Sequence, residues 1–228
     1  MRKVTFLSIL ILLLTSCSSF LPAKPTSTPT PKPTATITLT PRLYSTLVSF
    51  NYYPELNAFQ KGCSNPGGCA QLLINEGWIY DSEKEAEAYG GNVIPSPVLS
   101  LQKLVGRCAT IAYAIAAGVL DDGYPPNILV VVASDVSHAI YLYQDSKGLW
   151  GYVQILQLAP MYRPHILVVD NQEPRFASIN DLFAYYVTEG THSADFYKYY
   201  FYTKKDLPEN WLTTTKTINP LSFTQTGP

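Results

Sequence analysis

Charged residues of either sign are scarce in this chain of 228 residues, of which Asp, Glu, Lys and Arg make up 14%. The 16 basic and 17 acidic residues give a formal net charge of −1, and no basic run is longer than a pair such as Lys204 and Lys205. A surface that binds nucleic acid needs clustered lysine and arginine to neutralise phosphates. The sequence therefore predicts no nucleic-acid partner and no electrostatic steering of a charged ligand.

Histidine and cysteine, the usual ligands of zinc, are also few. The 3 histidines, His138, His165 and His192, include no pair at helical spacing, and only Cys63 and Cys69 among the 4 cysteines lie close together in the sequence. A structural zinc site commonly takes its ligands from two such pairs. The sequence therefore favours neither a metal ion nor a cofactor.

An export signal is predicted at the N-terminus. Two basic residues precede the apolar run Val4–Leu14, which is too short to cross a bilayer, and Leu14-Thr15-Ser16-Cys17 ends the segment. This arrangement resembles the lipobox of bacterial lipoproteins, in which the cysteine thiol is acylated and the cysteine becomes the first mature residue. The resemblance implies a signal peptide over residues 1–17, lipidation of Cys17 and attachment to the extracytoplasmic face of the cell membrane. An ordinary signal peptide that contains a cysteine is the alternative.

A segment rich in threonine and proline follows the leader. Ser18–Arg42 holds 6 Pro, 7 Thr and 3 Ser and has no acidic residue, so it cannot bury an apolar core. We expect residues 18–44 to form an extended stalk of polyproline-like geometry. Residues 45–228 are long enough for one globular domain with its own core.

The globular part is predicted to belong to the α+β class. Its first helix is expected at residues 69–75. A second should begin at a capping box at residues 82–85 and end at Gly90-Gly91, and a third should span residues 108–119. A loop around Pro95 and Pro97 is expected between the second and third helices. The segment Cys108–Val119 is Ala-rich and almost entirely apolar, so it should be a buried central helix. Strands are expected after it at residues 128–133, 138–144, 149–156, 166–169 and 196–202, with a hairpin turn at 145–148 and a helix at 178–187 capped by Ser178. Helices followed by such strands predict a central helix packed on an antiparallel sheet.

Cys108 and His138 are the residues best suited to carry chemistry. Cys108 opens the predicted central helix, where free backbone N–H groups and the helix dipole favour a thiolate. His138 opens a predicted strand and could lie beside the tip of that helix, where it would take the thiol proton and later protonate a leaving amine. Taken singly, each has a structural alternative: a small core hydrophobe for Cys108 and a solvated strand-edge residue for His138.

The sequence Gly106-Arg107-Cys108 before an Ala-rich helix, followed by His138-Ala139 and an apolar residue, resembles the transglutaminase-like branch of the papain-like cysteine enzymes. The resemblance covers about residues 100–175. In that family cysteine, histidine and an acid follow in this order, the helix packs on an antiparallel sheet, and the reactions are acyl transfers at amides. The resemblance implies Cys108 as nucleophile and His138 as general base and acid.

The third member of the site departs from the family pattern. The family's acid usually lies on the next strand, a few residues after a tryptophan, but here Trp150 is followed by Gln154. Gln154 can orient an imidazole, although it stabilises imidazolium less than a carboxylate does. We assign the carboxylate to Asp170, which equally suits a turn with Asn171. Arg107 is a second departure, because many relatives carry an acid there.

Three further predictions complete the candidate site. Gln102 would donate to the oxyanion beside the Cys108 backbone N–H if its amide turned inward, whereas on a surface it would face solvent. Cys63 and Cys69 enclose a turn-rich loop in an exported protein and are expected to form a small disulfide. His165 and His192 suit surface roles, and either would replace His138 if the predicted strands were shifted.

The sequence supports three hypotheses for function. The first is a surface thiol enzyme that cleaves or transfers acyl groups at peptide or isopeptide amides of proteins or cell-wall peptides. The second is a cell-wall amidase of a neighbouring papain-like branch, in which cysteine and histidine are usually further apart in sequence. The third is a non-catalytic module that binds peptide or glycan, in keeping with the 17 tyrosines.

Overall fold

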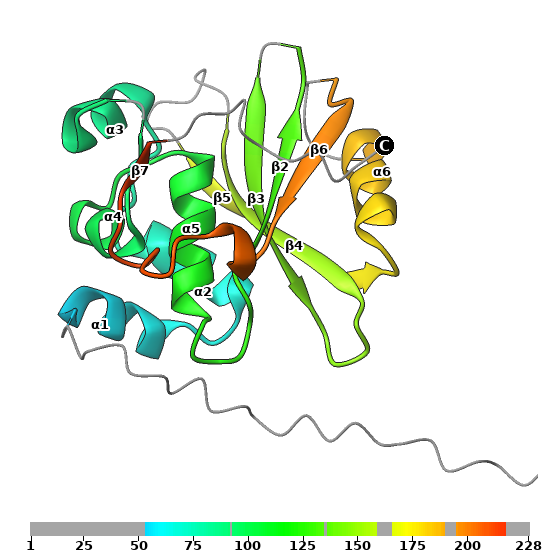
Figure 1. The fold of residues 1–228 in the computed structure, drawn as a ribbon, viewed down its shortest axis with the longest axis horizontal. Helices are drawn as coiled ribbons and strands as arrows, with labels where there is room; N and C mark the ends of the chain where they lie inside the picture. The colour runs from blue at the N-terminus through cyan, green and yellow to red at the C-terminus, as the bar shows by residue number, and fades with distance from the viewer. Residues whose placement is uncertain (1–52, 92, 135, 159–165, 190–194, 218–228) are drawn as a thin grey trace, which may run out of the picture. The chain divides into compact units, whose positions relative to one another are not determined.

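The computed structural model describes residues 53–91, 93–134, 136–158, 166–189 and 195–217 (Figure 1). All described residues belong to the unit of residues 43–228. The predicted signal peptide with Cys17 and the predicted stalk lie outside the described residues, as do His165 and His192.

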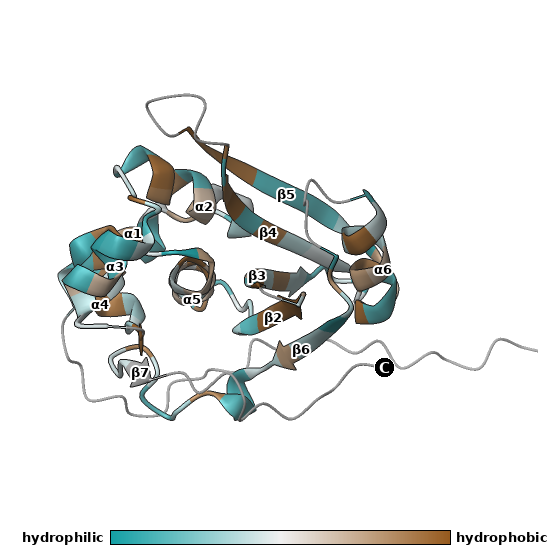
Figure 2. Cartoon of the chain, turned by 90° about the horizontal axis from the view of Figure 1, so that it is seen from above, coloured by the Kyte–Doolittle hydropathy of each residue, from teal (hydrophilic) through white to brown (hydrophobic). Residues whose placement is uncertain are grey.

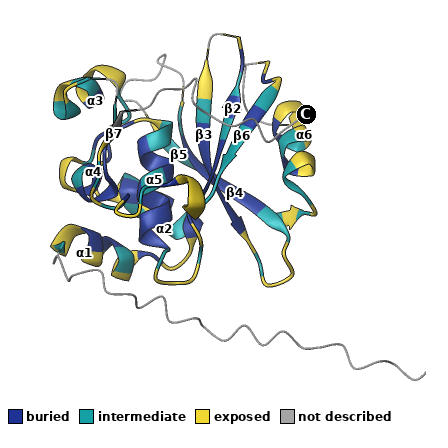
Figure 3. Cartoon of the chain, viewed as in Figure 1, coloured by how far each residue is buried: buried dark blue, intermediate teal, exposed yellow. Residues whose placement is uncertain are grey.

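The helices of the first half of the domain surround one buried helix. Their bounds are α1 (Pro54–Gly62), α2 (Pro66–Asn75), α3 (Ser82–Tyr89), α4 (Pro97–Lys103) and α5 (Cys108–Gly118). Eight residues of α5 are buried, and Figure 3 shows this helix at the centre of the domain. Its alanines are small enough for neighbouring elements to approach it closely on several sides. The prediction of a buried central helix from Cys108 is confirmed.

The main sheet has five antiparallel strands in the order β5-β4-β3-β2-β6. Their bounds are β2 (Asn127–Val132), β3 (Ser137–Gln144), β4 (Trp150–Gln157), β5 (Leu167–Phe176) and β6 (Lys198–Tyr202). The turn between β3 and β4 is closed by the Asp145 N–H, which donates to the Leu149 carbonyl, and by Gly148 with a φ of 80°. The predicted antiparallel sheet and hairpin turn are therefore confirmed.

Helices cover both faces of this sheet (Figure 2). α5 packs on one face of β3, and α6 (Ile179–Glu189) lies on the other. Along β3, Ala139 and Tyr141 join the core cluster that contains α5, whereas Ile140 and Leu142 join the cluster that contains α6. Such alternation follows from the opposite directions of successive side chains in a strand. A short sheet of β1 (Val93–Ile94) and β7 (Lys216–Thr217) and a 3-10 turn, η1 (Lys204–Asp206), complete the described α+β domain.

Two local predictions near the central helix are wrong. The expected loop at Pro97 is the start of α4, because a proline loses no helical hydrogen bond in the first turn and the Ser96 hydroxyl caps the helix by accepting from the Leu99 N–H. The expected capping box at residues 82–85 does not form either. Asp81 caps α3 instead, accepting from two backbone N–H groups, and Glu85 is buried in contacts with α5.

The last of the predicted meander strands is longer than its apolar run. β5 continues through polar residues as far as Phe176, since it pairs along its length with β4. Asp170 lies within this strand, opposite Gln154. The reading of Asp170 and Asn171 as a turn is therefore wrong, and the carboxylate belongs to a fixed position in the sheet.

Candidate active site

Cys108 is the first residue of α5 and the one free cysteine among the described residues. Two backbone N–H groups donate to its sulfur, from Ala109 in α5 and from Ala139 in β3. The helix N-terminus and these donors each stabilise a negative charge on sulfur. The fold therefore places the thiol where a thiolate is favoured.

The Cys108 thiol is hydrogen-bonded to the imidazole of His138 near the start of β3. Burial raises the pKa of the thiol, but the charge and hydrogen bond of His138 and the backbone donors more than offset it, and the pKa falls to about 7. Burial lowers the pKa of His138, while the Cys108 thiolate, the hydrogen bond that His138 donates to Gln154 and the charge of Asp170 raise it, with a net increase. Both shifts favour a thiolate–imidazolium pair.

Gln154 of β4 determines which imidazole nitrogen faces the thiol. Its Oε1 lies 2.6 Å from His138 Nε2, and its Nε2 donates to Asp170 Oδ2 at 2.7 Å. An ionised carboxylate only accepts hydrogen bonds, so the amide nitrogen must face Asp170 and the amide oxygen must face His138. His138 Nε2 is then the donor, and Nδ1 is the nitrogen that remains for the Cys108 thiol.

Asp170 acts on the imidazole through Gln154 instead of touching it. The two residues lie opposite each other on β4 and β5, and the Tyr152 hydroxyl also donates to Asp170 Oδ2 at 3.2 Å. Both candidates for the third member thus belong to one hydrogen-bonded series, Cys108–His138–Gln154–Asp170, which we call the polar chain. Gln154 occupies the place at which the resemblance leads one to expect an acid.

The polar chain reaches α6 on the far side of the sheet. Tyr186 of α6 is fully buried, and its hydroxyl donates to Gln154 Oε1 at 3.2 Å. The ring of Tyr186 also packs edge-on against that of Tyr152, with centroids 5.5 Å apart. Gln154 is therefore held by donors and acceptors on three elements, β3, β5 and α6.

Tyr80 is a neighbour of Cys108 that sequence reasoning missed. Its hydroxyl is hydrogen-bonded to the thiol and to the backbone N–H of Cys108. Burial, followed by the neighbouring thiolate, raises the pKa of Tyr80, so the hydroxyl keeps its proton and can donate. A parallel bridge between Ile79 and Val105 brings the two segments together. No local sequence pattern predicts this bridge, because Tyr80 lies on an irregular segment that is far from Cys108 in sequence.

Gln102, the predicted oxyanion donor, is exposed on α4. The side chain that lies beside the Cys108 backbone N–H is that of Tyr80. Of the two candidates, Tyr80 is therefore the one in contact with Cys108.

A buried carboxylate supports the segment just before Cys108. Glu85 of α3 is 3% exposed and accepts from the Arg107 backbone N–H at 2.9 Å and from the Thr110 hydroxyl at 2.6 Å. Its other oxygen forms an ion pair with Arg107 Nε. Just before Arg107, Gly106 has a φ of 152°, and a Cβ there would lie 2.5 Å from the Thr110 side chain. Together these contacts position the first turn of α5.

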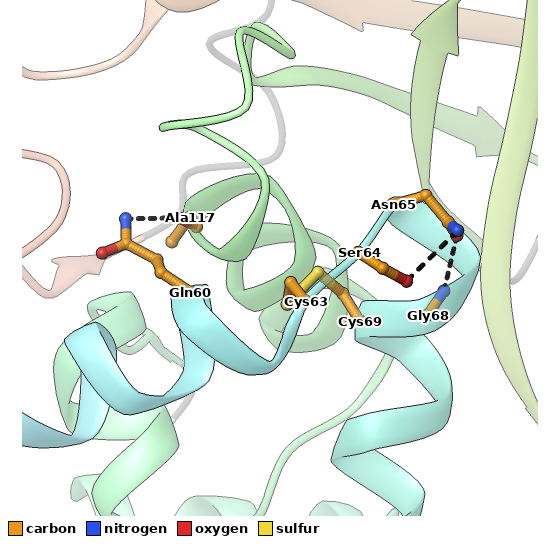
Figure 4. The surroundings of a disulfide bond; sticks show 7 residues. All are labelled: Gln60, Cys63, Ser64, Asn65, Gly68, Cys69 and Ala117. Carbon is orange, nitrogen blue, oxygen red and sulfur yellow. Dashed lines mark hydrogen bonds between the residues drawn. A yellow bond between two sulfur atoms is a disulfide. The ribbon is translucent and has the colours of Figure 1, made fainter.

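The far end of α5 packs against a disulfide between Cys63 and Cys69 (Figure 4). The Gln60 amide donates to the Ala117 carbonyl at 3.0 Å, and both cysteines are buried against the same end of the helix. The pairing leaves Cys108 as the thiol available for chemistry in the described part of the chain.

The described residues contain no group of three or more His, Cys, Asp and Glu side chains placed to hold a metal ion. Within the same residues, no helix is both long and apolar enough to cross a membrane. No protein-family model matches the sequence, and a search of curated proteins returns no significant match.

Proposed function

We propose that this domain is a transglutaminase-like thiol enzyme of papain-like architecture that cleaves or transfers acyl groups at peptide or isopeptide amides. The observation that carries the proposal is the hydrogen-bonded pair of Cys108 and His138, in which the pKa of a half-buried thiol falls to about 7. An inert core cysteine needs no imidazole partner, and burial alone would raise its pKa. The helix packed on an antiparallel sheet, and the order of cysteine, histidine and acid along the chain, add support.

In the proposed reaction, the Cys108 thiolate attacks the carbonyl carbon of an amide and forms a tetrahedral intermediate. The Tyr80 hydroxyl, which contacts the thiol and the backbone N–H of Cys108, is the side-chain group that would donate to the resulting oxyanion. When the C–N bond breaks, His138 gives its Nδ1 proton to the leaving amine and a thioester remains. Water or a second amine then attacks the thioester, gives a proton to His138 and releases the thiolate.

Gln154 and Asp170 are positioning residues in this scheme. Gln154 holds the imidazole in the tautomer whose Nδ1 faces sulfur. Its neutral amide adds no charge, so the electrostatic support for imidazolium comes from Asp170 behind it. Gln154 thus orients the imidazole and Asp170 supplies the negative charge, whereas in a conventional triad a single carboxylate does both.

We further propose that the protein is a lipoprotein whose Cys17 is acylated and whose stalk holds the enzyme away from the membrane surface. The basic and apolar leader, the lipobox-like sequence and the segment rich in threonine and proline support this. A protein or a cell-wall peptide on the same surface is then the substrate class within reach. Metabolic labelling with a palmitate analogue, compared between wild type and Cys17→Ser, tests the anchor.

The first test of the enzyme proposal is the pH dependence of iodoacetamide alkylation at Cys108 in the full chain, mapped by mass spectrometry. We expect a midpoint near the pKa of about 7. In His138→Ala the midpoint should rise to the ordinary thiol value of about 8.5 or above it, because burial then acts without the imidazole. Tyr199→Phe, which alters a buried tyrosine two strands away from His138 in the sheet, should leave the midpoint unchanged.

An ordinary midpoint in the wild type, unaffected by His138→Ala, would overturn the enzyme proposal. The polar chain would then be a structural network, and the domain would be a surface module that binds peptide or glycan. The measurement separates these outcomes without knowledge of the substrate.

A further inference from the structure

Arg107 places an exposed guanidinium directly before the nucleophile. Its side chain is 45% exposed, although its backbone is the N-cap of the buried helix α5. The Cys108 thiolate contributes to raising the pKa of this guanidinium, which shows that the two charges lie close enough to interact. None of the steps proposed for acyl transfer uses Arg107.

Glu85 anchors the guanidinium by one edge and leaves the rest of it available. In the described part of the chain, Arg107 donates from Nε to Glu85, and its terminal nitrogens make no hydrogen bond. Arginine carries five N–H donors in a planar fork, so the outer edge retains the paired geometry that suits a carboxylate. A lysine at this position would offer no such paired edge.

The Glu85 carboxylate does not occupy the edge of the guanidinium at which an incoming anion would bind. It is almost completely buried and accepts three hydrogen bonds, from the Arg107 N–H, Arg107 Nε and the Thr110 hydroxyl. The negative charge is therefore buried, whereas the side chain that carries the positive charge is 45% exposed. An ion pair built in this way holds the arginine stem in one direction, which reduces the entropy lost on binding a ligand.

We infer that Arg107 is a specificity-determining residue that binds a carboxylate next to the scissile carbonyl of the acyl substrate. The inference rests on the proposed function and names its substrate class: peptides with an acidic residue or a free carboxyl group beside the reacting amide.

A pair of alkylating reagents tests this inference without the natural substrate. Iodoacetate and iodoacetamide both react with the thiolate, but only iodoacetate carries a carboxylate beside the reacting carbon. The ratio of their second-order rate constants at Cys108 therefore cancels the extent of thiol ionisation and reports attraction of the anion. Arg107→Gln should lower the ratio roughly three- to tenfold, since it removes the attraction between two opposite charges a few ångströms apart.

Three comparisons control the measurement. Lys103→Gln removes one positive charge from the exposed end of α4 and should leave the ratio unchanged. Arg107→Lys keeps the charge but loses the fork, so its ratio should lie between those of wild type and Arg107→Gln. If Arg107→Gln fails to fold because Glu85 is left buried without its ion pair, the double variant Glu85→Gln, Arg107→Gln removes both charges and should show the same lowered ratio.

An unchanged ratio in folded Arg107→Gln or in the double variant overturns the substrate assignment while the enzyme proposal stands. A wild-type Cys108 with an ordinary pKa that ignores His138→Ala overturns the enzyme proposal and the substrate assignment with it. Added salt should lower the wild-type ratio toward that of the glutamine variant, because an exposed charge is screened.

Discussion

The two ends of α5 lie in different surroundings. At the C-terminal end, a Cβ on Gly118 would lie 2.5 Å from the Phe59 ring and less than 3 Å from the sulfurs of Cys63 and Cys69. At the N-terminal end, Cys108 meets an imidazole, a phenol and backbone N–H groups. Both ends are enclosed by other elements, but one is closed by apolar packing and a disulfide and the other by groups that exchange protons.

This difference separates stability from reactivity along a single helix. Close packing at the Gly118 end stabilises the fold and leaves no room for added atoms. The N-terminal end buries polar groups whose hydrogen bonds must offset the cost of removing them from water. We therefore expect substitutions at the first end to change unfolding, and substitutions at the second to change the pKa and reaction rate of Cys108.

The largest expected effect is on stability, from Gly118→Val. The added side chain overlaps Phe59 and both disulfide sulfurs, so we expect a loss of about 3 kcal/mol in the free energy of unfolding. Urea denaturation measures the loss, and the alkylation midpoint of Cys108 in the folded variant should stay near 7. Ala184→Val on the exposed side of α6 is the control and should cost less than about 1 kcal/mol. A shifted Cys108 midpoint in folded Gly118→Val would show that the two ends are coupled.

The next effect is on reactivity, from Asp170→Asn. Loss of the carboxylate charge lowers the pKa of His138, weakens imidazolium and so raises the pKa of Cys108. Alkylation of Cys108 below pH 7 should slow roughly three- to tenfold, since the lost charge acts across one intervening amide. Asp181→Asn, which removes an exposed carboxylate from the first turn of α6, should leave the rate unchanged.

An unchanged alkylation profile in Asp170→Asn would contradict a role for this carboxylate in supporting imidazolium. Gln154 would then orient the imidazole by itself. The expected direction is a loss of reactivity on the acidic side of the profile, with the two profiles converging at high pH, where the thiol is ionised in both proteins.

The smallest effect is expected from Tyr186→Phe. The substitution removes one donor to Gln154 Oε1 and keeps the buried ring, so unfolding should become easier by about 1 kcal/mol. Alkylation should change less than threefold, because the Gln154 amide is still held by Asp170. A change as large as that of Asp170→Asn would mean that α6 controls the tautomer of His138.

Much of the architecture follows from patterns that are local in the sequence. The all-apolar, Ala-rich run after Cys108 predicts a buried helix, and the alternating or β-branched runs predict the strands β2 to β4. The predictions failed where the local sequence was compatible with two different structures. Ser82 and Asp81 were both able to cap α3, and Pro97 suited a loop as well as a first helical turn, so the outcome depended on which contacts the remaining chain supplied.

Some residues of the candidate site could likewise be predicted from the sequence, and others could not. Cysteine and histidine are rare enough here for their chemistry to single out Cys108 and His138. Tyr80 could not be singled out among 17 tyrosines, and Glu85 matched a capping motif that it does not form. The sequence offers Gln154 and Asp170 as alternatives for the third residue of the site, whereas the register of β4 and β5 gives each a place in the polar chain.

The sequence by itself determined which groups were available and which segments had to be buried, because composition and periodicity act over a few neighbouring residues. Only the tertiary structure decided that His138 reaches the thiol through Nδ1, that Gln154 lies between imidazole and carboxylate, and that Glu85 holds Arg107 beside Cys108. Hydrogen bonds and ion pairs depend on distances of about 3 Å between residues far apart in the chain, and only the packing of α3, α5 and the sheet sets those distances.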